Sequence, residues 1–368
     1  MKAIISGGGS GGHIFPAVAI ANAIKKRWPD ADILFVGAEG RMEMEKVPAA
    51  GYEIKGLPIA GLQRKLTLPN IWKNLQLPFR MMKSNSMVKH ILNDFQPDIV
   101  VGVGGFASEP TLKAAAKLGF PTLLQEQNSY AGLTNKLLAK DARAICVAYD
   151  GMERFFPKEK IVFTGNPVRA DIEQMSCTRE EGLAHFGLDA AMPTVLVVGG
   201  SLGARSVNQM MLSNLNYLGV RQVQYIWQTG RWGYDQAAAA VSEAGMGERV
   251  KVHRFIQRMD LAYAAADVVI SRAGAIAISE LCLVGKPVVL VPSPNVAEDH
   301  QTKNAMALVD KGAALMVPDV ECGSKCLPAV DGLLADANRM QAMSAAIRRL
   351  AVRGAADKIV EQIAKIVK

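Results

Sequence analysis

A glycine-rich loop near the N-terminus constrains the fold of this chain more than any other stretch. Residues 6–16, SGGGSGGHIFP, follow a short apolar run at 3–5 and precede a helical pattern over 17–26. A strand, a glycine loop and a helix in this order leave backbone N–H groups unpaired at the start of the helix, and glycines let an anion approach them closely. The loop therefore predicts a site for a phosphate or diphosphate.

Two well-known phosphate-binding motifs do not fit this loop. No Lys-Ser or Lys-Thr pair follows the glycines, as a P-loop requires, and no Asp or Glu stands where the dinucleotide fingerprint places one for ribose. His13 at the first helical turn is more informative, because the positive end of a helix keeps an imidazole neutral, as a general base must be. The alternative for His13 is a residue that only caps the helix.

The length and composition of the chain predict two α/β domains. Of its 368 residues, 50% are hydrophobic and 6% aromatic, which suffices for about two ordinary cores. Lys2 and the strand behind it do not resemble a secretory leader, and we find no apolar segment of about 20 residues. We therefore expect a cytoplasmic protein that does not span a membrane. The five scattered cysteines indicate reduced thiols, and because Cys322 and Cys326 lack companion ligands we predict no metal site.

Positive charge is concentrated in residues 1–165, which hold 21 Lys and Arg against 14 Asp and Glu, seven of the net eight charges. No acidic residue occurs between Glu53 and Asp94, where cations alternate with apolar groups and with Pro69 and Pro78. Prolines disfavour one long helix here, and apolar groups rimmed by cations suit contact with anionic lipid. A core helix with a solvated face is the alternative, and the few aromatic residues argue against nucleic acid. We predict a membrane-surface segment that includes Lys65, Ile71, Trp72, Lys73, Leu75, Phe79, Arg80 and Lys83.

The first half of the chain repeats a strand-and-helix pattern typical of parallel sheets. Apolar strands are expected at 33–36, 98–103, 121–124, 145–147 and 161–163. Gly104 and Gly105 form a second glycine turn, which predicts a second anion site. Glu126 lies in a polar run at the end of the next strand, where parallel sheets bind ligands, and capping of the turn is the alternative. Gly and Pro within 164–169 mark a linker. We place the domains at 1–165 and 166–368, with the last helix, 357–367, either returning to the first domain or ending the second.

The second half restarts the same plan with a strand at 194–198 and a glycine loop, and further strands are expected at 250–252, 267–270 and 287–291. Two Rossmann-like domains in tandem fit this pattern. The block 271–280 is the most informative, because its loop and helix start suit a diphosphate, while Glu280, a carboxylate in an apolar helix, can reach ribose hydroxyls. A buried helix is the alternative. Gln301 follows the next strand at the same edge and is expected to hydrogen-bond a sugar, with solvent exposure as the alternative.

Five motifs together resemble the MurG family of glycosyltransferases: residues 8–13, 126–128, 165–169, 199–201 and 279–280. The match runs through almost the whole chain. The resemblance implies the GT-B fold, in which two Rossmann-like domains with parallel sheets face each other across a cleft. It implies transfer of N-acetylglucosamine from UDP-N-acetylglucosamine to undecaprenyl-diphosphate-linked muramyl-pentapeptide, converting lipid I to lipid II in peptidoglycan synthesis. It further implies inversion without a metal or other cofactor, and peripheral attachment to the cytoplasmic face of the inner membrane.

The same resemblance assigns roles to particular residues. The first domain would bind the acceptor, through Gly104, Gly105 and Glu126, and the second the UDP-sugar, with Glu280 on the ribose and Ile256 near the uracil. His13 would deprotonate the acceptor's 4-hydroxyl, while Arg169 and the helix start at Ala275 would stabilise the departing UDP. Donor contacts are expected from Ser10, Gly11, Gly12, Asn128, Arg169, Ser201, Ile256, Ala275, Ile276, Ala277, Ile278, Ser279, Glu280 and Gln301.

The chain departs from the family pattern at two positions. Gln125 stands where some relatives carry His, which leaves His13 as the stronger candidate for the base. Glu109 stands where they carry Gly, and its carboxylate would repel an acceptor diphosphate if it pointed inward.

Two other functions stay open from the residues alone. A UDP-N-acetylglucosamine 2-epimerase shares the twin-domain plan and the donor but needs no lipid. A nucleotide-sugar or dinucleotide binding protein without transferase activity would not need His13.

Overall fold

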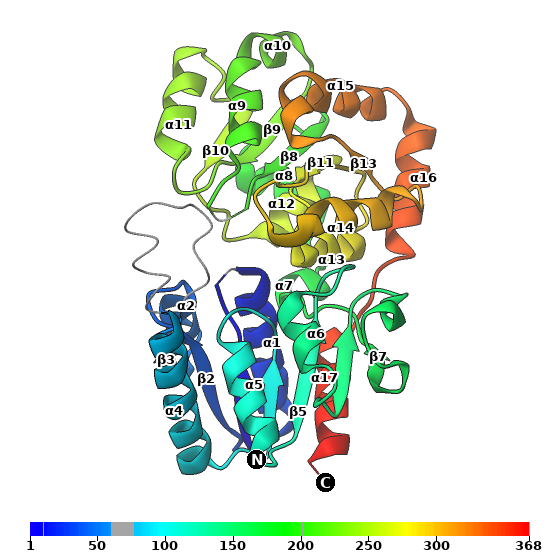
Figure 1. Ribbon diagram of the computed structural model, residues 1–368. Coiled ribbons are helices and arrows are strands. Elements are labelled where there is room, and N and C mark those ends of the chain that lie inside the picture. Colours follow the sequence, from blue (N-terminus) through cyan, green and yellow to red (C-terminus); the bar gives the residue numbers. More distant parts are fainter. Residues whose placement is uncertain (10, 60–76, 201, 368) are drawn as a thin grey trace. The chain divides into compact units, whose positions relative to one another are not determined.

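The computed structural model describes residues 1–9, 11–59, 77–200 and 202–367. The chain divides into two compact units, each an α/β sandwich (Figure 1). Unit 1 comprises Met1–Arg169 and Gly354–Lys368, and unit 2 comprises Ala170–Arg353. The boundary between them lies four residues beyond the expected one at 165/166, and the last helix belongs to unit 1.

Unit 1 is built on a sheet of seven parallel strands in the order β3-β2-β1-β4-β5-β6-β7. Six of the strands match runs expected from the sequence, whereas β3 was not predicted. The alternation of Glu53 and Lys55 with half-buried neighbours makes β3 an edge strand without a continuous apolar run. The strands are β1 (Lys2–Ser6), β2 (Asp32–Ala38), β3 (Glu53–Leu57), β4 (Ile99–Gly102), β5 (Thr122–Glu126), β6 (Ala144–Val147) and β7 (Ile161–Phe163).

Helices cover both faces of this sheet, so its central strands are apolar on both sides. Ile5 faces the cluster that includes Ile20 of α1 and Ile363 of α17, while Ile4 faces the cluster that includes Leu92 of α4 and Leu112 of α5. The helices are α1 (Gly11–Arg27), α2 (Glu43–Ala49), α4 (Leu77–Phe95), α5 (Ser108–Lys117), α6 (Leu133–Leu138) and α17 (Ala355–Ile366), with 3-10 turns η1 (Met152–Arg154) and η2 (Lys158–Lys160).

Unit 2 repeats this plan with six parallel strands in the order β10-β9-β8-β11-β12-β13. The strands are β8 (Thr194–Val198), β9 (Gln224–Gln228), β10 (Val250–His253), β11 (Val268–Ser271), β12 (Val288–Leu290) and β13 (Leu315–Met316). The helices are α7 (Ala170–Glu173), α8 (Arg179–Phe186), α9 (Arg205–Ser213), α10 (Leu215–Val220), α11 (Tyr234–Glu243), α12 (Met259–Ala265), α13 (Ala275–Val284), α14 (His300–Val309), α15 (Cys322–Leu334) and α16 (Ala337–Arg348), with 3-10 turns η3 (Ala297–Asp299) and η4 (Asp319–Glu321). The parallel sheets in both units confirm the expected fold class.

The strand order places a glycine loop at the centre of each sheet. In unit 1, β1 pairs with both β2 and β4; in unit 2, β8 pairs with both β9 and β11. The chain therefore changes direction across the sheet beside its first strand, and open α/β sheets bind ligands at the carboxyl ends of the strands at this point. The loops that follow β1 and β4 in unit 1, and β8 and β11 in unit 2, contain the glycines singled out above.

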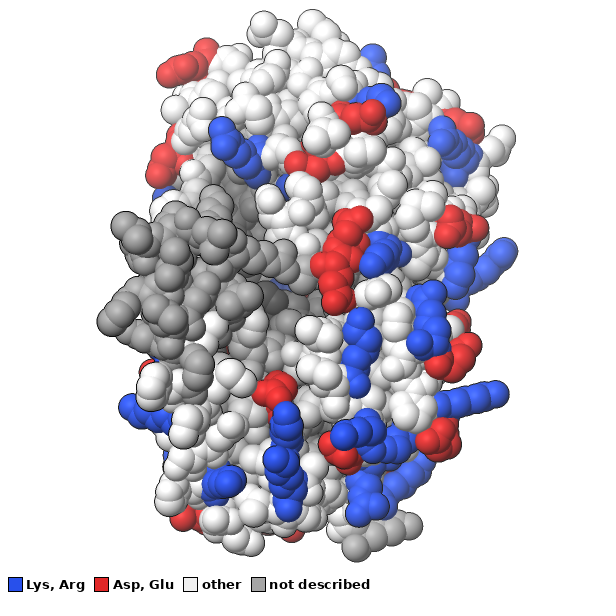
Figure 2. Space-filling model, viewed as in Figure 1, with Lys and Arg blue, Asp and Glu red and all other residues white. Residues whose placement is uncertain are grey.

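Surface features bear on the predicted membrane contact. On the face shown in Figure 2, Lys and Arg side chains of unit 1 gather on the side of β7 and α17, with acidic side chains among them. Among the described helices, we find none whose length and hydropathy would let it cross a membrane.

Candidate active site

His13 lies in the first turn of α1, half-buried. Its Nδ1 is 2.9 Å from the backbone carbonyl oxygen of Gly8. Because a carbonyl only accepts hydrogen bonds, Nδ1 carries the proton of the neutral ring and Nε2 is the basic nitrogen. The Gly104 backbone lies against the ring, since a Cβ there would be 3.1 Å from Nε2. This tautomer suits a general base that acts through Nε2.

The second glycine turn packs directly on the first. The Gly8 N–H donates to the Gly104 carbonyl at 3.3 Å, and a Cβ on Gly105 would be 2.4 Å from the Gly8 carbonyl oxygen. Gly105 also has a φ of +92°. Both this backbone angle and the lack of space for a Cβ therefore exclude a residue with a side chain. The Glu109 carboxylate, in the first turn of α5, pairs with Lys113 at 3.2 Å, which balances its charge.

Buried amides connect the end of β5 with the end of unit 1's first segment. Gln125 is fully buried and its Nε2 donates to Oδ1 of Asn166 at 3.0 Å. Gln127 donates to Oε1 of Gln125, and Asn166 donates to the Gln127 carbonyl at 3.0 Å. Gln125 therefore has a structural role in this network of buried amides.

Glu126 supports its own loop. Its carboxylate is 2% exposed and accepts the Asn128 N–H at 3.0 Å, the Gly132 N–H at 3.0 Å and the Asn135 Nδ2 at 2.9 Å. These bonds hold Asn128, an expected donor contact, at the carboxyl end of β5. The acceptor contact expected of Glu126 stays a prediction, and the geometry favours a positioning role.

Unit 2 contains a cavity of about 680 Å³ at the carboxyl ends of β8 and β11. Gly200 and Gly274 face open space there, and α9 and α13 both begin at its wall. Two helix N-termini around one cavity favour an anion. The cavity is lined by Val198, Gly199, Gly200, Gly203, Ala204, Arg205, Ser206, Gln209, Ser271, Arg272, Gly274, Ala277, Ser293, Asn295, Gln301 and Asp319.

Arg272 and Asp319 in this cavity were not predicted as a pair. Arg272 Nη1 donates to Oδ1 of Asp319 at 2.5 Å and to the Val291 carbonyl at 3.0 Å, while Nη2 donates to Oγ of Ser206 at 3.0 Å. The guanidinium thus braces the ends of β11 and β12 against the start of α9. Asp319 is 47 residues from Arg272 in the sequence, and no local pattern relates the two.

The predicted donor residues of α13 fall on different sides of the helix. Ala277 lines the cavity, whereas Ile278 is 2% exposed and packs in the core. Ser279 bonds back to the Ala275 carbonyl at 3.0 Å, and Glu280 accepts from the Tyr263 hydroxyl at 3.4 Å. Ile276 is also largely buried. The donor contacts expected of Ile276 and Ile278 stay predictions, and the burial of both side chains leaves only the helix backbone to make them.

Two further expected contacts lie beside the cavity. The Ile256 side chain is buried and its N–H donates to Oε1 of Gln228 at 2.9 Å; Nε2 of Gln228 in turn donates to the Gly200 carbonyl at 3.3 Å. Gln228, which was not predicted, thereby ties the 256 loop to the glycine loop. Gln301 lines the cavity and accepts the Ser293 N–H at 2.8 Å.

The remaining expected residues lie at the start of α1, at the end of unit 1's first segment or outside the described residues. Gly11 and Gly12 open α1, and Arg169 is half-buried where unit 1's first segment ends. On α4, Phe79 is 76% exposed, and Arg80 and Lys83 are at least partly exposed. The expected contacts outside the described residues are Ser10, Lys65, Ile71, Trp72, Lys73, Leu75 and Ser201.

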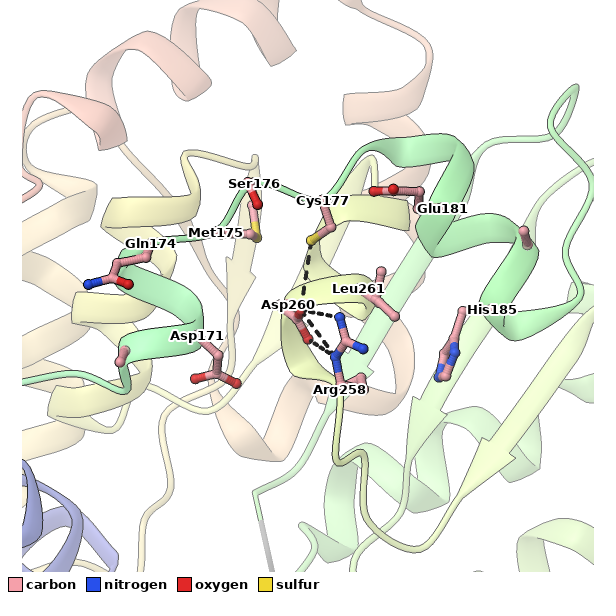
Figure 3. Close-up of a pocket in the computed structure, with 12 residues that line it drawn as sticks. Asp171, Gln174, Met175, Ser176, Cys177, Glu181, His185, Arg258, Asp260 and Leu261 are labelled. Atoms are coloured by element: carbon pink, nitrogen blue, oxygen red, sulfur yellow. Dashed lines mark hydrogen bonds and ion pairs between the residues drawn. The ribbon is translucent and has the colours of Figure 1, made fainter.

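A second cavity of unit 2, of about 810 Å³, lies beside α7, α8 and α12 (Figure 3). Arg258 holds the Asp260 carboxylate with two donors, Nε at 2.9 Å and Nη2 at 2.7 Å, and these bonds lower the pKa of Asp260. Burial and the Asp260 carboxylate raise the pKa of the Cys177 thiol, whose Sγ lies 3.9 Å from Asp260. The sequence analysis did not predict the Arg258–Asp260 pair or the cavity that it lines.

Two family models match the chain. The N-terminal domain of glycosyltransferase family 28 matches residues 3–147, and the C-terminal domain of the same family matches residues 194–359. The chain belongs to glycosyltransferase family 28. Each model lies largely within one unit, so the two candidate regions, the His13 loop and the unit 2 cavity, fall in different domains of the family.

Individual members of the family are similar over their whole length. A relative from Parabacteroides distasonis is 57% identical over 366 residues, covering 100% of this chain and 98% of the relative, and one from Flavobacterium psychrophilum is 50% identical with the same coverage. Both are named UDP-N-acetylglucosamine--N-acetylmuramyl-(pentapeptide) pyrophosphoryl-undecaprenol N-acetylglucosamine transferase.

Solved structures agree with this assignment. The crystal structure of Acinetobacter baumannii MurG matches with a TM-score of 0.77 at 27% identity, covering 99% of both chains. Together with the full-length relatives, it confirms the resemblance to the MurG family. A UDP-GlcNAc 2-epimerase from Neisseria meningitidis, at 15% identity and a TM-score of 0.66 over 99% of this chain and 100% of that one, shares the fold alone.

Proposed function

We propose that this family 28 enzyme transfers N-acetylglucosamine from UDP-N-acetylglucosamine to the 4-hydroxyl of undecaprenyl-diphosphate-linked muramyl-pentapeptide, the step that makes lipid II for peptidoglycan. The observation that carries the proposal is the 57% identity, over the full length of the chain, to a relative that bears this transferase name. The epimerase alternative has only a shared fold in its favour.

The donor is proposed to bind in the 680 Å³ cavity of unit 2. Its diphosphate would lie at Gly200 and Gly274, where backbone N–H groups at two helix starts meet open space. Glu280 would hydrogen-bond the ribose. The backbone beside Ile256 would contact the uracil. Arg169 and Asn128 are proposed as further donor contacts, together with the predicted residues of the glycine loops and Gln301.

The chemical step is proposed as a single displacement at the anomeric carbon. The acceptor 4-hydroxyl oxygen bonds to this carbon, the bond from the carbon to the UDP β-phosphate oxygen breaks, and UDP leaves with the electron pair. The hydroxyl proton passes to Nε2 of His13, whose Nδ1 keeps its own proton against the Gly8 carbonyl. One displacement inverts the anomeric centre. The helix start at Ala275 and the neighbouring backbone donors stabilise the charge on UDP without a metal.

Peripheral attachment to the cytoplasmic face of the membrane is part of the proposal, and nucleic acid is not a proposed partner. Among the described residues, membrane attachment is supported by α4, where Phe79 is 76% exposed and Met82 is 70% exposed near basic side chains. Flotation with vesicles containing anionic lipid is expected to carry the protein. If a variant with Phe79 and Met82 replaced by Ser still binds these vesicles, the exposed face of α4 is not the membrane-binding surface.

The transfer itself is tested by product analysis. The purified protein is incubated with donor labelled in the sugar and with a lipid I analogue. We expect the label in the lipid product, with the anomeric proton coupling of a β-linkage in its NMR spectrum. Label that instead appears in the 2-epimer of the donor would support the epimerase alternative.

A further inference from the structure

Glu43 is a buried carboxylate that the sequence analysis did not single out. It is the first residue of α2 and is 1% exposed. Its Oε2 accepts the Gly9 N–H at 2.8 Å, and its Oε1 accepts the Ala38 N–H at 3.1 Å. Both oxygens act as acceptors, as in an ionised carboxylate. Because burying such a group is costly, its position calls for a role beyond packing.

The bonds to Glu43 and to His13 meet at one peptide group. The peptide between Gly8 and Gly9 uses its N–H to donate to Glu43, and its C=O accepts from Nδ1 of His13 at 2.9 Å. This peptide is planar and conjugated, and hydrogen bonds in a chain polarise one another. A carboxylate bound to the N–H therefore makes the C=O a stronger acceptor for the imidazole N–H.

We propose that Glu43 is a positioning residue for His13 and acts on it through the Gly8–Gly9 peptide. The inference rests on the proposed function in taking His13 as the base. In Ser-His-Asp triads a carboxylate bonded to the Nδ1–H fixes the tautomer, orients the ring and stabilises the imidazolium that forms. Here a peptide group stands between the carboxylate and the ring and transmits the same effects over a longer path.

The surrounding glycines hold this peptide in place. A Cβ on Gly8 would be 2.1 Å from Oε1 of Glu43, and one on Gly37 would be 2.7 Å from the Glu43 Cγ. On the other side, Gly105 approaches the Gly8 carbonyl so closely that a Cβ would lie 2.4 Å from its oxygen. The peptide is thus clamped between the carboxylate and the second glycine turn, which limits rotation of the carbonyl that His13 binds.

Other charged groups of the neighbouring elements are paired with each other or exposed. Glu109 pairs with Lys113 at 3.2 Å and Glu45 with Lys46 at 3.0 Å. Glu39 and Arg41, in the turn before α2, are exposed, and the cations of α1 lie in its last turn. In the described part of these elements, Glu43 is therefore the buried charge connected to His13 by hydrogen bonds.

The first test measures the imidazole itself, without turnover. The chain has five histidines, so the His13 signals in an NMR titration are identified by their absence in His13→Ala. In the unaltered protein we expect the neutral ring to carry its proton on Nδ1; an Nε2–H tautomer would overturn the proposal. In Glu43→Gln we expect the pKa of His13 to fall by about half to one pH unit, because the imidazolium loses a negative charge that stabilises it.

The second test measures the reaction. Glu43→Gln is expected to lower kcat about tenfold or more, to move the acid limb of the kcat profile to lower pH, and to leave the donor KM within about threefold. Glu45→Gln, on the same helix with an exposed carboxylate, is the matched control and should change none of these. In a His13→Ala background Glu43→Gln should cause no further loss, because the two residues act as one unit.

Two further results would contradict the inference. One is an unchanged His13 pKa and tautomer in Glu43→Gln, and the other is an additional loss of residual rate when Glu43→Gln is added to His13→Ala. Either would make Glu43 a merely structural support of the glycine loop. If the unaltered protein shows no acceptor-dependent transfer, the proposed function fails, while the NMR titration still decides whether Glu43 acts on His13.

Discussion

At the scale of single residues, hydrogen bonds between side chains and backbone groups define the local geometry of both candidate regions. The Gly8 carbonyl fixes the tautomer of His13, and Glu126 holds the backbone of Asn128. In unit 2, the side chain of Gln228 links the Ile256 N–H to the Gly200 carbonyl. Such bonds restrict the conformations that the loops can adopt.

Replacing His13 by Ala removes the proposed base and leaves the unit 2 cavity intact. We expect kcat to fall about 10²–10⁴-fold, with the affinity for UDP within about threefold of the unaltered protein. Steady-state kinetics and calorimetric titration with UDP measure the two effects separately. His90→Ala, an exposed histidine on α4, is the control. Turnover that persists in His13→Ala would instead favour another base.

The Arg258–Asp260 pair predicts a pH-dependent contribution to stability. The pKa of Asp260 is lowered in the folded protein, so the pair stabilises unit 2 above the ordinary pKa of Asp, near 4, and this contribution is lost as the pH falls through the lower folded value. Asp260→Asn is expected to cost about 1–2 kcal/mol at pH 7, since Arg258 is 55% exposed and partly screened. Urea unfolding should show this difference unchanged at pH 5 and shrinking below pH 4. A difference that does not depend on pH would assign the cost to packing.

At the scale of helices and strands, the sequence pattern located most of the elements and the glycine loops that follow β1, β4, β8 and β11. The continuous apolar runs of β1, β4, β8 and β11 are visible because both faces of these strands are buried. The edge strands β3 and β13 were missed because one is half polar and the other has two residues. Strand β9 was missed because its two ends are Gln224 and Gln228, which leave an apolar run of only three residues. Both amides are buried and bond to groups far away in the sequence.

The supporting residues of the site could not be predicted for a related reason. Glu43 is 34 residues from the glycine it holds, and Asp319 is 113 residues from Ser206. The residues next to Glu43 and Asp319 in the sequence do not indicate that the first carboxylate is buried or which groups the two carboxylates bond. The strand order determines these contacts, because it brings the carboxyl ends of distant strands to one edge.

Gly203 tests whether the loop after β8 needs its close packing. It has a φ of +88°, and a Cβ there would be 2.2 Å from the Thr229 carbonyl oxygen. Gly203→Ala is expected to displace the loop and to weaken UDP binding about tenfold or more. Gly187→Ala is the matched control, with a φ of +61° and no neighbouring atom within 4 Å of the Cβ, and should cost only about 1 kcal/mol of stability. Equal UDP affinities in the two variants would contradict the role of this loop in donor binding.

At the scale of the whole molecule, the chain forms two units with separate cores, and its last helix returns to the first unit. Helix α17 packs against α1 (Figure 1). Its Ile359 and Ile363 are fully buried in the cluster that contains Ile20 of α1. The fold of unit 1 is therefore complete only when α17 has been made. Unit 2 is continuous in sequence, from Ala170 to Arg353.

This arrangement predicts which unit loses stability when the packing of α17 is disrupted. Ile363→Ala should destabilise unit 1 by about 2–5 kcal/mol, the usual cost of a large cavity in a core, and leave unit 2 unchanged. Hydrogen exchange of the full-length protein, read peptide by peptide, should show faster exchange in β1 and β2 but not in β8 and β11. Glu361→Ala, on the exposed side of the same helix, is the control. Equal loss of protection in both units would mean that they unfold together.

The most direct test of the whole account is the release of UDP from UDP-N-acetylglucosamine by the purified protein, in detergent containing EDTA, with and without a lipid I analogue. We predict release that depends on the acceptor and continues in the presence of the chelator. Release without the acceptor, conversion of the donor to its 2-epimer, or no turnover would contradict the proposed transfer. The family membership and the fold would then stand without this reaction.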